Sequence, residues 1–490
     1  MSIAQRVIKN TVYVFSSNII NRVITFFFIV YAARILGPKD FGIYGLIHAV
    51  IFFFSFFQDL GVGPMGIREI AKNKNNVEYL FNHILSLKIV LAIIIYPLLI
   101  ITVYLLGYKS EVIYLFYLAG VTMVFSSFAA SFGILYIAFE KIAIPSIIST
   151  LTTFLSTVSS IVVLKMGYGL EGILWIGLLG NFLGAVISGT WVRWKVLKYK
   201  FVYNYDAWYG FIKQSLPFGI IGFLNGINRN ISIFFLSQLK GPLFTENTLG
   251  YYNAASNIPY SLMMIPASLR VALLPTLAAN IENKALVRRY ADMNMKFLLL
   301  FVSFPLVIVT VIFPEELMLL IFGGKYLDAA PALTILGVAY AIRIFHTPLA
   351  IALSATPYIK KFVPMAMLAA LINIIFAFVF IPFFGFKGAA LAVCISMVFW
   401  VVAAHESFST VFGIKVFDCK KAVKTFVPFT VLLVFLYFLQ TQKISIFMIA
   451  PVSIVLYIVL MYKSGIVTKE EKITLIGSIK KLLLPKRNTG

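Results

Sequence analysis

Long apolar runs, separated by short polar breaks, occupy the sequence from residue 12 to residue 462. A helix needs about 20 apolar residues to cross the hydrocarbon core of a bilayer. The pattern therefore predicts an all-α polytopic membrane protein with fourteen membrane-spanning helices. Their cores are expected at residues 12–33, 42–62, 79–105, 112–138, 143–164, 168–191, 216–238, 250–278, 297–322, 328–356, 362–382, 386–411, 425–439 and 444–462.

The first and last runs need separate treatment. The first is too long for the core of a signal peptide, so we interpret it as a retained helix. The last pair is the least regular, because 425–439 is short and the break near Gln440 also fits a re-entrant turn.

Composition supports a membrane protein. Hydrophobic residues make up 61% of the 490 positions and charged residues 12%, against about a quarter charged in a soluble domain. This excludes a soluble enzyme. The two cysteines, Cys394 and Cys419, give neither a disulfide framework nor a metal cluster. No phosphate-binding G-x-x-x-x-G-K-S/T loop occurs, so no cofactor is expected.

Basic residues predict the orientation of the helices. The chain has 41 Lys and Arg against 18 Asp and Glu, a net charge of +23. With a cytoplasmic N-terminus, 28 of the 41 basic residues fall on the cytoplasmic side, 8 on the other side and 5 inside spans. Since cytoplasmic loops are rich in Lys and Arg, we expect a multi-pass protein of the cell membrane with both termini cytoplasmic. The basic tail from Lys463 to Arg487 suits lipid headgroups, and no nucleic acid partner is expected.

An internal repeat divides the chain. Asn18-Ile19-Ile20-Asn21-Arg22 recurs 207 positions later as Asn225-Gly226-Ile227-Asn228-Arg229, with six predicted spans between the copies. The two halves should then be parallel six-helix lobes with a site between them, a transporter arrangement. The expected domains are two lobes at 1–192 and 214–412, a basic and aromatic cytoplasmic linker helix at 193–213, two further helices at 413–463 and a basic tail at 464–490.

Basic residues inside spans are the first candidates for function. A lysine or arginine at the centre of a span costs about 2.5–3.5 kcal/mol on insertion scales, so it normally faces a partner or a wet cavity. Five occur, namely Arg22, Lys88, Arg229, Arg270 and Arg343. Lys88 and Arg270 lie in the cytoplasmic third of their spans, where snorkelling to the surface is an equal alternative.

The repeat places two arginines in equivalent positions. Asn18 precedes Arg22 by four residues and Asn225 precedes Arg229 by four, so each pair shares one helix face. The symmetry of the halves predicts that the two arginines meet at the central interface. Arginine binds phosphate in a bidentate manner, which favours an anionic, phosphate-bearing substrate. The alternative is that each arginine is neutralised by helix C-terminal carbonyls or by Asp59.

Short motifs near the start of each half resemble a known family. Ala33-Arg34-x-Leu36-Gly37-Pro38-x-x-Phe41-Gly42-x-Tyr44, followed by Asp59-Leu60-Gly61 and Arg68, resembles the opening of the Wzx-type polysaccharide-transport flippases of the multidrug/oligosaccharidyl-lipid/polysaccharide exporter superfamily. Ser215-Leu216-Pro217 and Gly250-Tyr251-x-x-Ala254-Ala255 are similar to the start of that family's second half. The resemblance covers the whole chain.

The resemblance implies a cavity between the lobes, formed mainly by helices 1, 2, 7 and 8, with alternating access. It implies a polyprenyl-diphosphate-linked glycan as substrate, the bilayer as surroundings, and glycan biosynthesis enzymes as candidate partners. Arg22 lies in a segment similar to one that bears an essential arginine in lipid II flippases. Asp59, Arg34 and Arg68 are candidates for coupling or gating. Many relatives carry an aspartate where this chain has Asn228, which argues against a carboxylate-based ion relay there.

The sequence thus predicts a flippase for a lipid-linked oligosaccharide, with Arg22, Arg229, Arg270, Arg343, Asn18 and Asn225 as candidate substrate-binding residues. The alternative is a cation-coupled exporter of small molecules in which Asp59 is central. A membrane enzyme acting on the same lipid is a third possibility, but such an enzyme would be expected to have a large outer loop or an acidic dyad.

Overall fold

The computed structural model of the chain describes residues 3–139, 143–239, 244–280, 282–354, 356, 359–413 and 419–442, and the single positions 453, 456, 457 and 459. Within these ranges some side chains fall outside the description, among them those of residues 3–12, 225 and 229.

Every regular element in these ranges is a helix. The first half contains α1 (Ile3–Asp59), α2 (Val62–Lys72), α3 (Val77–Leu105), α4 (Ser110–Ala138), α5 (Ala143–Lys165), α6 (Gly169–Lys195) and α7 (Tyr205–Gln238). The second contains α8 (Thr248–Ser261), α9 (Met264–Ala279), α10 (Lys284–Leu298), α11 (Phe304–Ile312), α12 (Pro314–Phe322), α13 (Ala330–Ser354), α14 (Ile359–Phe412) and α15 (Cys419–Thr441). Short segments η1 (Lys74–Asn76), η2 (Leu299–Ser303) and η3 (Gly324–Ala329) join them.

The described helices confirm the all-α polytopic membrane fold. Eight helical segments are long and apolar enough to cross a membrane. Only residues 453, 456, 457 and 459 of the predicted span 444–462 are described, so the count of fourteen stays a prediction.

Two of the long helices are bent at a glycine. α1 has 57 residues and α14 has 54, and a straight helix of either length would be roughly 80–85 Å long, well beyond the ~30 Å bilayer core. Gly37 in α1 has φ 75° and Gly385 in α14 has φ 57°, a backbone region open to glycine and strained for other residues. Predicted spans 12–33 and 42–62 therefore form two arms of one kinked helix.

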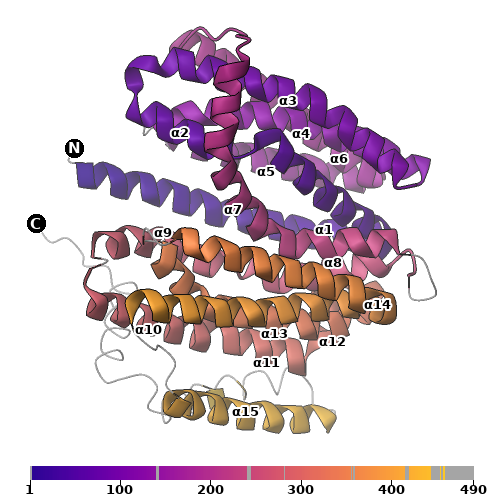
Figure 1. The fold of residues 1–490 in the computed structure, drawn as a ribbon. Coiled ribbons are helices and arrows are strands. Elements are labelled where there is room, and N and C mark those ends of the chain that lie inside the picture. The colour runs from indigo at the N-terminus through magenta and orange to yellow at the C-terminus, as the bar shows by residue number, and fades with distance from the viewer. Residues whose placement is uncertain are drawn as a thin grey trace, which may run out of the picture.

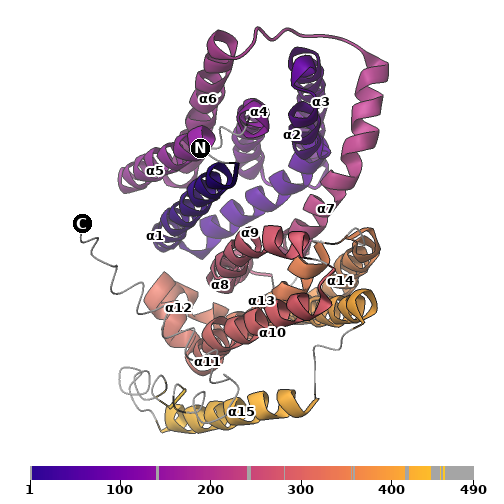
Figure 2. The same ribbon diagram turned by 90° about the vertical axis from the view of Figure 1, so that its left-hand side faces the viewer.

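The helices gather in two groups, which Figures 1 and 2 both show. Helices α1 to α6 pack together as an N-lobe, and α8 to α14 as a C-lobe, with α15 beside α11. Helix α7 connects the lobes: its first part crosses the direction of the other helices in both views and packs against α2 and α3, and the helix also packs against α14. We call the end at which α1 begins, marked N in Figure 1, the proximal end, and the opposite end, where α1 is kinked at Gly37, the distal end.

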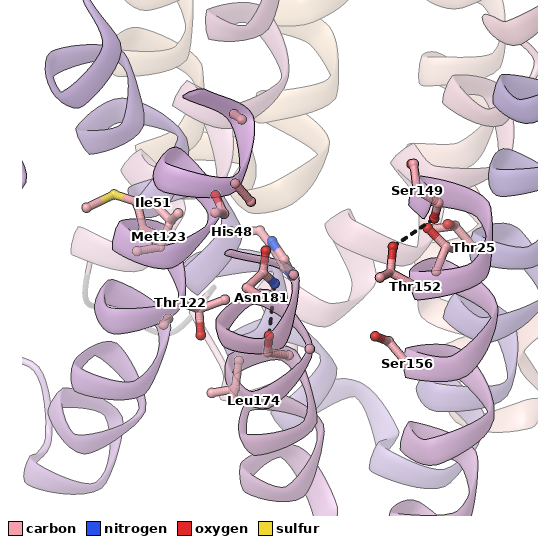
Figure 3. A pocket seen from close by; sticks show the side chains of 18 of the residues that line it. Thr25, His48, Ile51, Thr122, Met123, Ser149, Thr152, Ser156, Leu174 and Asn181 are labelled. Carbon is pink, nitrogen blue, oxygen red and sulfur yellow. Dashed lines mark hydrogen bonds between the residues drawn. The ribbon is translucent and has the colours of Figure 1, made fainter. Parts of the chain in front are cut away.

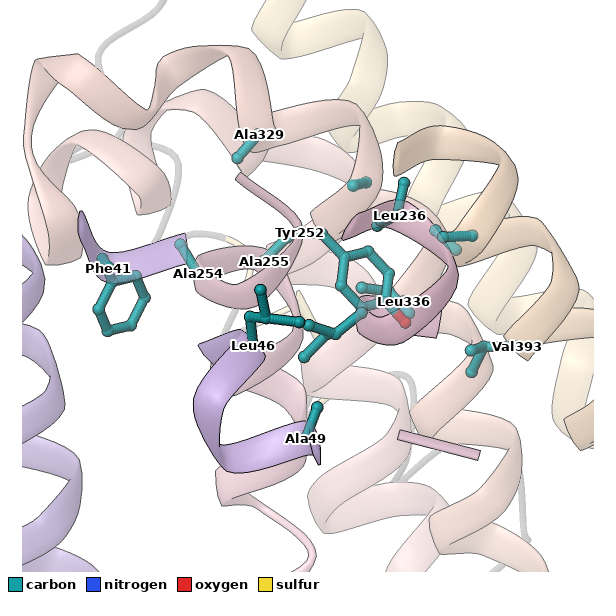
Figure 4. Close-up of a cluster of buried hydrophobic side chains, with 14 of the residues drawn as sticks. Phe41, Leu46, Ala49, Leu236, Tyr252, Ala254, Ala255, Ala329, Leu336 and Val393 are labelled. Atoms are coloured by element: carbon teal, nitrogen blue, oxygen red, sulfur yellow. The ribbon is translucent and has the colours of Figure 1, made fainter. Parts of the chain in front are cut away.

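The largest apolar core crosses the boundary between the lobes. Phe41 and Leu46 of α1 pack with Tyr252 of α8, Leu336 of α13 and their neighbours, all buried (Figure 4). Small residues such as Ala254 lie in the same cluster and let helix backbones come close. The lobes are therefore held together by a continuous apolar interface in the distal half of the molecule.

The link between the lobes differs from the predicted linker helix. α6 runs to Lys195, residues 196–204 are not helical, and α7 continues from Tyr205 through the next span. Trp208 and Phe211 are buried in an N-lobe core. The backbone N–H of Val202 donates to Ser86 Oγ at 2.9 Å. These two aromatic residues therefore pack on protein, whereas Trp194, Tyr203 and Tyr209 of the same link are exposed.

A buried ion pair connects α1 with α3. Lys88 Nζ lies 2.6 Å from Asp59 Oδ1, and the lysine side chain is only 2% exposed, whereas the carboxylate is 36% exposed. Lys88 therefore does not snorkel to a surface. Asp59 lies just before the break between α1 and α2, where Leu60 has φ 47° and Gly61 has φ 82°. The pair attaches this break to the N-lobe.

We expect Asp59→Ala to destabilise the protein by about 3–5 kcal/mol, because it leaves a buried ammonium group without a counter-charge. Lys88→Met should cost less, since the partly exposed Asp59 can be hydrated, and the double variant should recover most of the stability lost in Asp59→Ala. Thermal unfolding in detergent measures all three. Equal losses in the two single variants would contradict this role for the pair.

Candidate functional site

A cavity of about 380 Å³ lies between the two lobes. Its walls come from both arms of α1 and from α7, α8 and α13. The lining residues are Thr25, Ile29, Tyr44, Gly45, His48, Phe52, Gly226, Asn230, Ile233, Asn253, Asn257, Tyr260 and Arg343. The two arms of α1, together with α7 and α8, correspond to predicted helices 1, 2, 7 and 8, which the family resemblance implied as the cavity walls. Helix α13 is a further wall that the resemblance did not imply.

Arg343 brings positive charge to this interlobe cavity. It lies on α13 and is the one Lys, Arg, Asp or Glu residue among the described lining residues. His346, one turn further along α13, is buried and contacts Trp400 of α14 at 6.4 Å between ring centroids. The other polar groups of the wall are amides, hydroxyls and the imidazole of His48. The cavity is thus cationic and rich in hydrogen-bond donors.

Arg22 lies one helical turn proximal to the cavity. Positions 18, 22, 25 and 29 share one face of α1, and Thr25 and Ile29 line the cavity. Both Asn18 and Arg22 are exposed. Asn21, which precedes Thr25 by one turn, is directed toward α5, since its Nδ2 donates to Ser149 Oγ at 3.1 Å. This register places Arg22 beside the proximal mouth of the interlobe cavity.

The side chains of Asn225 and Arg229 lie outside the described residues. Position 229 falls on the face of α7 that bears Gly226, Asn230 and Ile233, and these three line the cavity. The predicted meeting of Arg22 and Arg229 therefore stays a prediction.

The remaining candidates lie away from the interlobe cavity. Asp59 pairs with Lys88 inside the N-lobe. Arg68 on α2 pairs with Glu69 at 2.6 Å and lies over the Phe218 ring of α7 at 5.2 Å, near the proximal end. Arg270 is exposed on α9 and is not among the lining residues.

Arg34 closes the distal end. Its Nε donates to the carbonyl oxygen of Ile321 at 2.8 Å, and its Nη2 donates to that of Leu320. These carbonyls belong to the last turn of α12, where helix carbonyls lack internal partners and the helix dipole favours a cation. Tyr326 Oη of η3 donates to the carbonyl oxygen of Ala33 at 2.8 Å. The first arm of α1 is thereby joined to the C-lobe.

Charged groups add to this closure. Glu246, in the loop before α8, lies 2.9 Å from Lys39 Nζ and 3.2 Å from Lys109 Nζ. Hydrogen bonds and charge from the two lysines lower the pKa of Glu246 below its ordinary 4.5, and Glu246 raises the pKa of Lys39 above 10.5. Glu246 and Lys39 therefore stay ionised across neutral pH, and the loop of the C-lobe remains attached to the N-lobe.

A second, larger cavity lies inside the N-lobe. It measures about 800 Å³ and lies among α1, α4, α5 and α6 (Figure 3). Thr25, Tyr44 and His48 line both cavities, so the two adjoin. The larger cavity has no Lys, Arg, Asp or Glu among its described lining residues.

The sequence analysis missed this second cavity, although a signal was present. Ser149, Thr152, Thr153, Ser156, Thr157 and Ser160 follow one another at the spacing of a single helix face in α5. A polar face on a membrane helix normally points to the protein interior. The cavity polar groups from α8, Asn253 and Asn257, carry no comparable periodic signal.

Asn228 belongs to a neutral cluster in the C-lobe. Asn373 Nδ2 donates to its Oδ1 at 3.0 Å, and Ser396 Oγ donates to the same oxygen at 3.4 Å. All three side chains are buried.

The described residues contain no group of His, Cys, Asp and Glu side chains that could hold a metal ion.

Fold and cavities together define a two-lobed polytopic membrane protein of the transporter type. The chain belongs to the family described as polysaccharide biosynthesis protein, whose sequence model matches residues 7–281, more than half of its length. The predicted membership of a polysaccharide family is thereby confirmed at the level of polysaccharide biosynthesis.

Two curated relatives have related roles. The chain is 23% identical over 419 residues to the capsular polysaccharide biosynthesis protein CapF of Staphylococcus aureus, which covers 83% of this chain and all of that protein. It is 31% identical over 127 residues to the teichuronic acid biosynthesis protein TuaB of Bacillus subtilis, covering 26% of this chain and 25% of the relative.

Solved structures share the fold. The lipid II flippase MurJ in an inward closed conformation superposes with a TM-score of 0.75 at 15% identity, covering 92% of this chain and 98% of MurJ. An inward-facing multidrug transporter of the MATE family gives a TM-score of 0.63 at 16% identity, covering 80% and 94%.

The distal closure depends on the close approach of α1 and α8. A Cβ added to Gly250 would lie 1.9 Å from the backbone oxygen of Pro38, a clash that no side-chain rotation relieves. We expect Gly250→Val to move the lobes apart at the distal end. Spin labels at Ser110→Cys and Lys325→Cys, in a variant without native cysteines, measure the separation, which should increase by several ångströms. Gly210→Val is the control, since its added Cβ meets open space. An unchanged label distance in Gly250→Val would show that this contact does not hold the lobes together.

Proposed function

We propose that the protein is a flippase that moves a polyprenyl-diphosphate-linked oligosaccharide across the cell membrane by alternating access. Its product would serve the synthesis of a surface polysaccharide or of the glycan of a glycoprotein. The cationic cavity between the lobes is the observation that carries this proposal. The family and the biosynthetic roles named for CapF and TuaB support it.

The diphosphate would bind at the interlobe cavity. Arg343 lines the cavity, Arg22 lies at its proximal mouth, and Arg229 shares the helix face that borders it. Arginine stays charged at any physiological pH and forms two parallel bonds with phosphate. Asn18 and Asn225 are one turn from Arg22 and Arg229 and would add amide hydrogen bonds. Arg270, exposed on α9, would meet the substrate only at the surface of the C-lobe.

Alternating access would follow from the asymmetry of the lobe contacts. Arg34, Glu246 and the apolar cluster close the distal end, and substrate would enter from the proximal, cytoplasmic side. Carrying sugars and a diphosphate through hydrocarbon without partners would cost many kcal/mol. A movement of the lobes avoids this cost, because the distal contacts between the lobes break while other contacts between protein groups form. The polyprenyl tail would remain in the bilayer.

Cation-coupled export of small molecules is the alternative. Such a transporter would have a carboxylate in the transport cavity. The described lining residues of both cavities include no Asp or Glu, and Asp59 is occupied by Lys88. These observations favour an anionic substrate.

We expect Arg22→Ala, Arg229→Ala and Arg343→Ala each to lower transport by about tenfold to a hundredfold, since a hydrogen bond to a charged group contributes about 1.5–3 kcal/mol. Lysine at each position should restore part of the rate, because it keeps the charge and loses the bidentate geometry. The assay follows the appearance of a lipid-linked oligosaccharide in the outer leaflet of proteoliposomes, detected by a membrane-impermeant reagent.

Arg288→Ala is the matched control, because Arg288 is an exposed arginine on α10 outside both cavities. Normal transport by all three cavity variants, at normal expression, would overturn the assignment of the diphosphate site. No transport by the wild-type protein of any lipid-linked glycan would overturn the proposed function.

A further inference from the structure

The N-lobe cavity has a size and position that the diphosphate site does not explain. At about 800 Å³ it is twice as large as the interlobe cavity, and it falls within the range of roughly 300–1,000 Å³ found for pockets that enclose drug-sized ligands. In Figure 3 the side chains of α5 and α6 face one another across it. A cavity of this size in the middle of a helical lobe has room for several ring-sized groups.

Its walls are lined by hydroxyls and small residues. The hydroxyl face of α5, defined by Ser149, Thr152, Thr153, Ser156, Thr157 and Ser160, forms one wall. α6 contributes Gly177, Gly180, Asn181 and Gly184. A Cβ added to Gly177 or Gly184 would meet open space. These glycines are therefore not required for helix packing, and their effect is to leave the cavity wide.

One buried polar group in the wall lacks a partner. Tyr136 of α4 lines the cavity and is 5% exposed, and its hydroxyl has no hydrogen-bond partner among the described residues. A buried hydroxyl without a partner is destabilising by about 1–3 kcal/mol in proteins. A ligand that offers hydrogen-bonding groups would remove this deficit.

We infer that the N-lobe cavity binds the sugar residues of the lipid-linked glycan, and neutral sugars in particular. This inference rests on the proposed function and assigns a separate subsite to the glycan. Sugar hydroxyls both donate and accept hydrogen bonds, as do the Ser, Thr and Tyr hydroxyls that line the wall. This complementarity of hydrogen-bonding groups involves all six hydroxyls of the α5 face, and it does not depend on a single contact.

Other ligand classes fit this wall less well. An apolar ligand would displace water from the Ser, Thr and Tyr hydroxyls of this wall without offering them hydrogen bonds, which is unfavourable in a buried site. A phosphate or an acidic sugar would find no lysine or arginine among the described lining residues, and an organic cation would find no carboxylate. The absence of both charge signs therefore selects for a neutral, hydroxyl-rich ligand.

The two cavities are placed so that one substrate can occupy both. Thr25, Tyr44 and His48 line each of them, so these three side chains mark the place where the cavities adjoin. A diphosphate beside Arg343 would lie in the interlobe cavity. The first sugar attached to it would lie near His48, and the sugars that follow it can then extend toward the hydroxyl face of α5.

The experiment compares two substrates, a polyprenyl-diphosphate carrying one sugar and the same lipid carrying a neutral oligosaccharide, in proteoliposomes. Gly177→Leu and Gly184→Leu add side-chain volume to the N-lobe cavity, since an added Cβ meets open space at both positions. They should lower transport of the oligosaccharide by about tenfold or more and leave transport of the one-sugar lipid within about twofold of wild type. Thr190→Leu is the control, since Thr190 is exposed on the same helix and outside the cavity.

A second variant tests the unpaired hydroxyl. Tyr136→Phe should lower oligosaccharide transport by about three- to tenfold while the melting temperature of the ligand-free protein stays equal or rises. A purely structural tyrosine would instead give a lower melting temperature and equal losses for both substrates.

Equal transport of both substrates by the two leucine variants, at the wild-type rate or at a uniformly reduced one, would overturn the glycan subsite. That result would leave the proposed function standing, because the wild-type protein would still transport lipid-linked glycan. Failure of the wild-type protein with both substrates would overturn both.

Discussion

A polar side chain in the interior of a bilayer needs either a protein partner or a cavity, and this constraint determines which polar residues of this protein hold the fold together and which are free to bind. The buried Lys88 is satisfied by Asp59 at 2.6 Å, and Asn228 is satisfied by Asn373. These groups stabilise the lobes. Arg343 and the hydroxyl face of α5 instead border cavities. Among the described residues, the polar groups that line cavities fall into two adjoining sites.

The two sites differ in charge, and this difference matches the parts of a lipid-linked glycan. The interlobe cavity carries the guanidinium of Arg343, with Arg22 near its mouth, whereas the N-lobe cavity presents hydroxyls and no charge among its described residues. The interlobe cavity lies between the two lobes, which would move relative to each other under the proposed function. The distal contacts of Arg34 with the end of α12, and of Glu246 with Lys39 and Lys109, join surfaces of both lobes. Under the proposed alternating access, they are the contacts that a state open at the distal end would break.

Much of the fold could be predicted from the sequence, because length and hydropathy determine where a helix can cross a bilayer. The limits lie at the bends. Gly37 and Gly385 turn two predicted pairs of spans into kinked helices, and the span expected at 250–278 is split between α8 and α9. Such breaks depend on local backbone angles and on packing partners that hydropathy does not encode. The link between the lobes also depends on packing partners, since Trp208 and Phe211 are buried in an N-lobe core.

The candidate site was predictable in part. The free-energy cost of placing a charge inside a bilayer identified the intramembrane basic residues as candidates. One of them, Arg343, lines the interlobe cavity. The same reasoning could not separate Lys88, which has a partner on another helix, from Arg343, because pairing depends on tertiary contacts. Because the candidates were chosen by charge, the uncharged N-lobe cavity was not predicted. Its signal, the periodic hydroxyls of α5, becomes a cavity only when α6 places glycines opposite them.

The most direct measurement is an experimental structure of the protein with a polyprenyl-diphosphate-linked neutral oligosaccharide bound. The division of the substrate between two cavities predicts the diphosphate beside Arg343 and Arg22, and the sugars between the hydroxyl face of α5 and the glycines of α6. A structure with the diphosphate away from these arginines, or with the sugars outside the N-lobe, would contradict it.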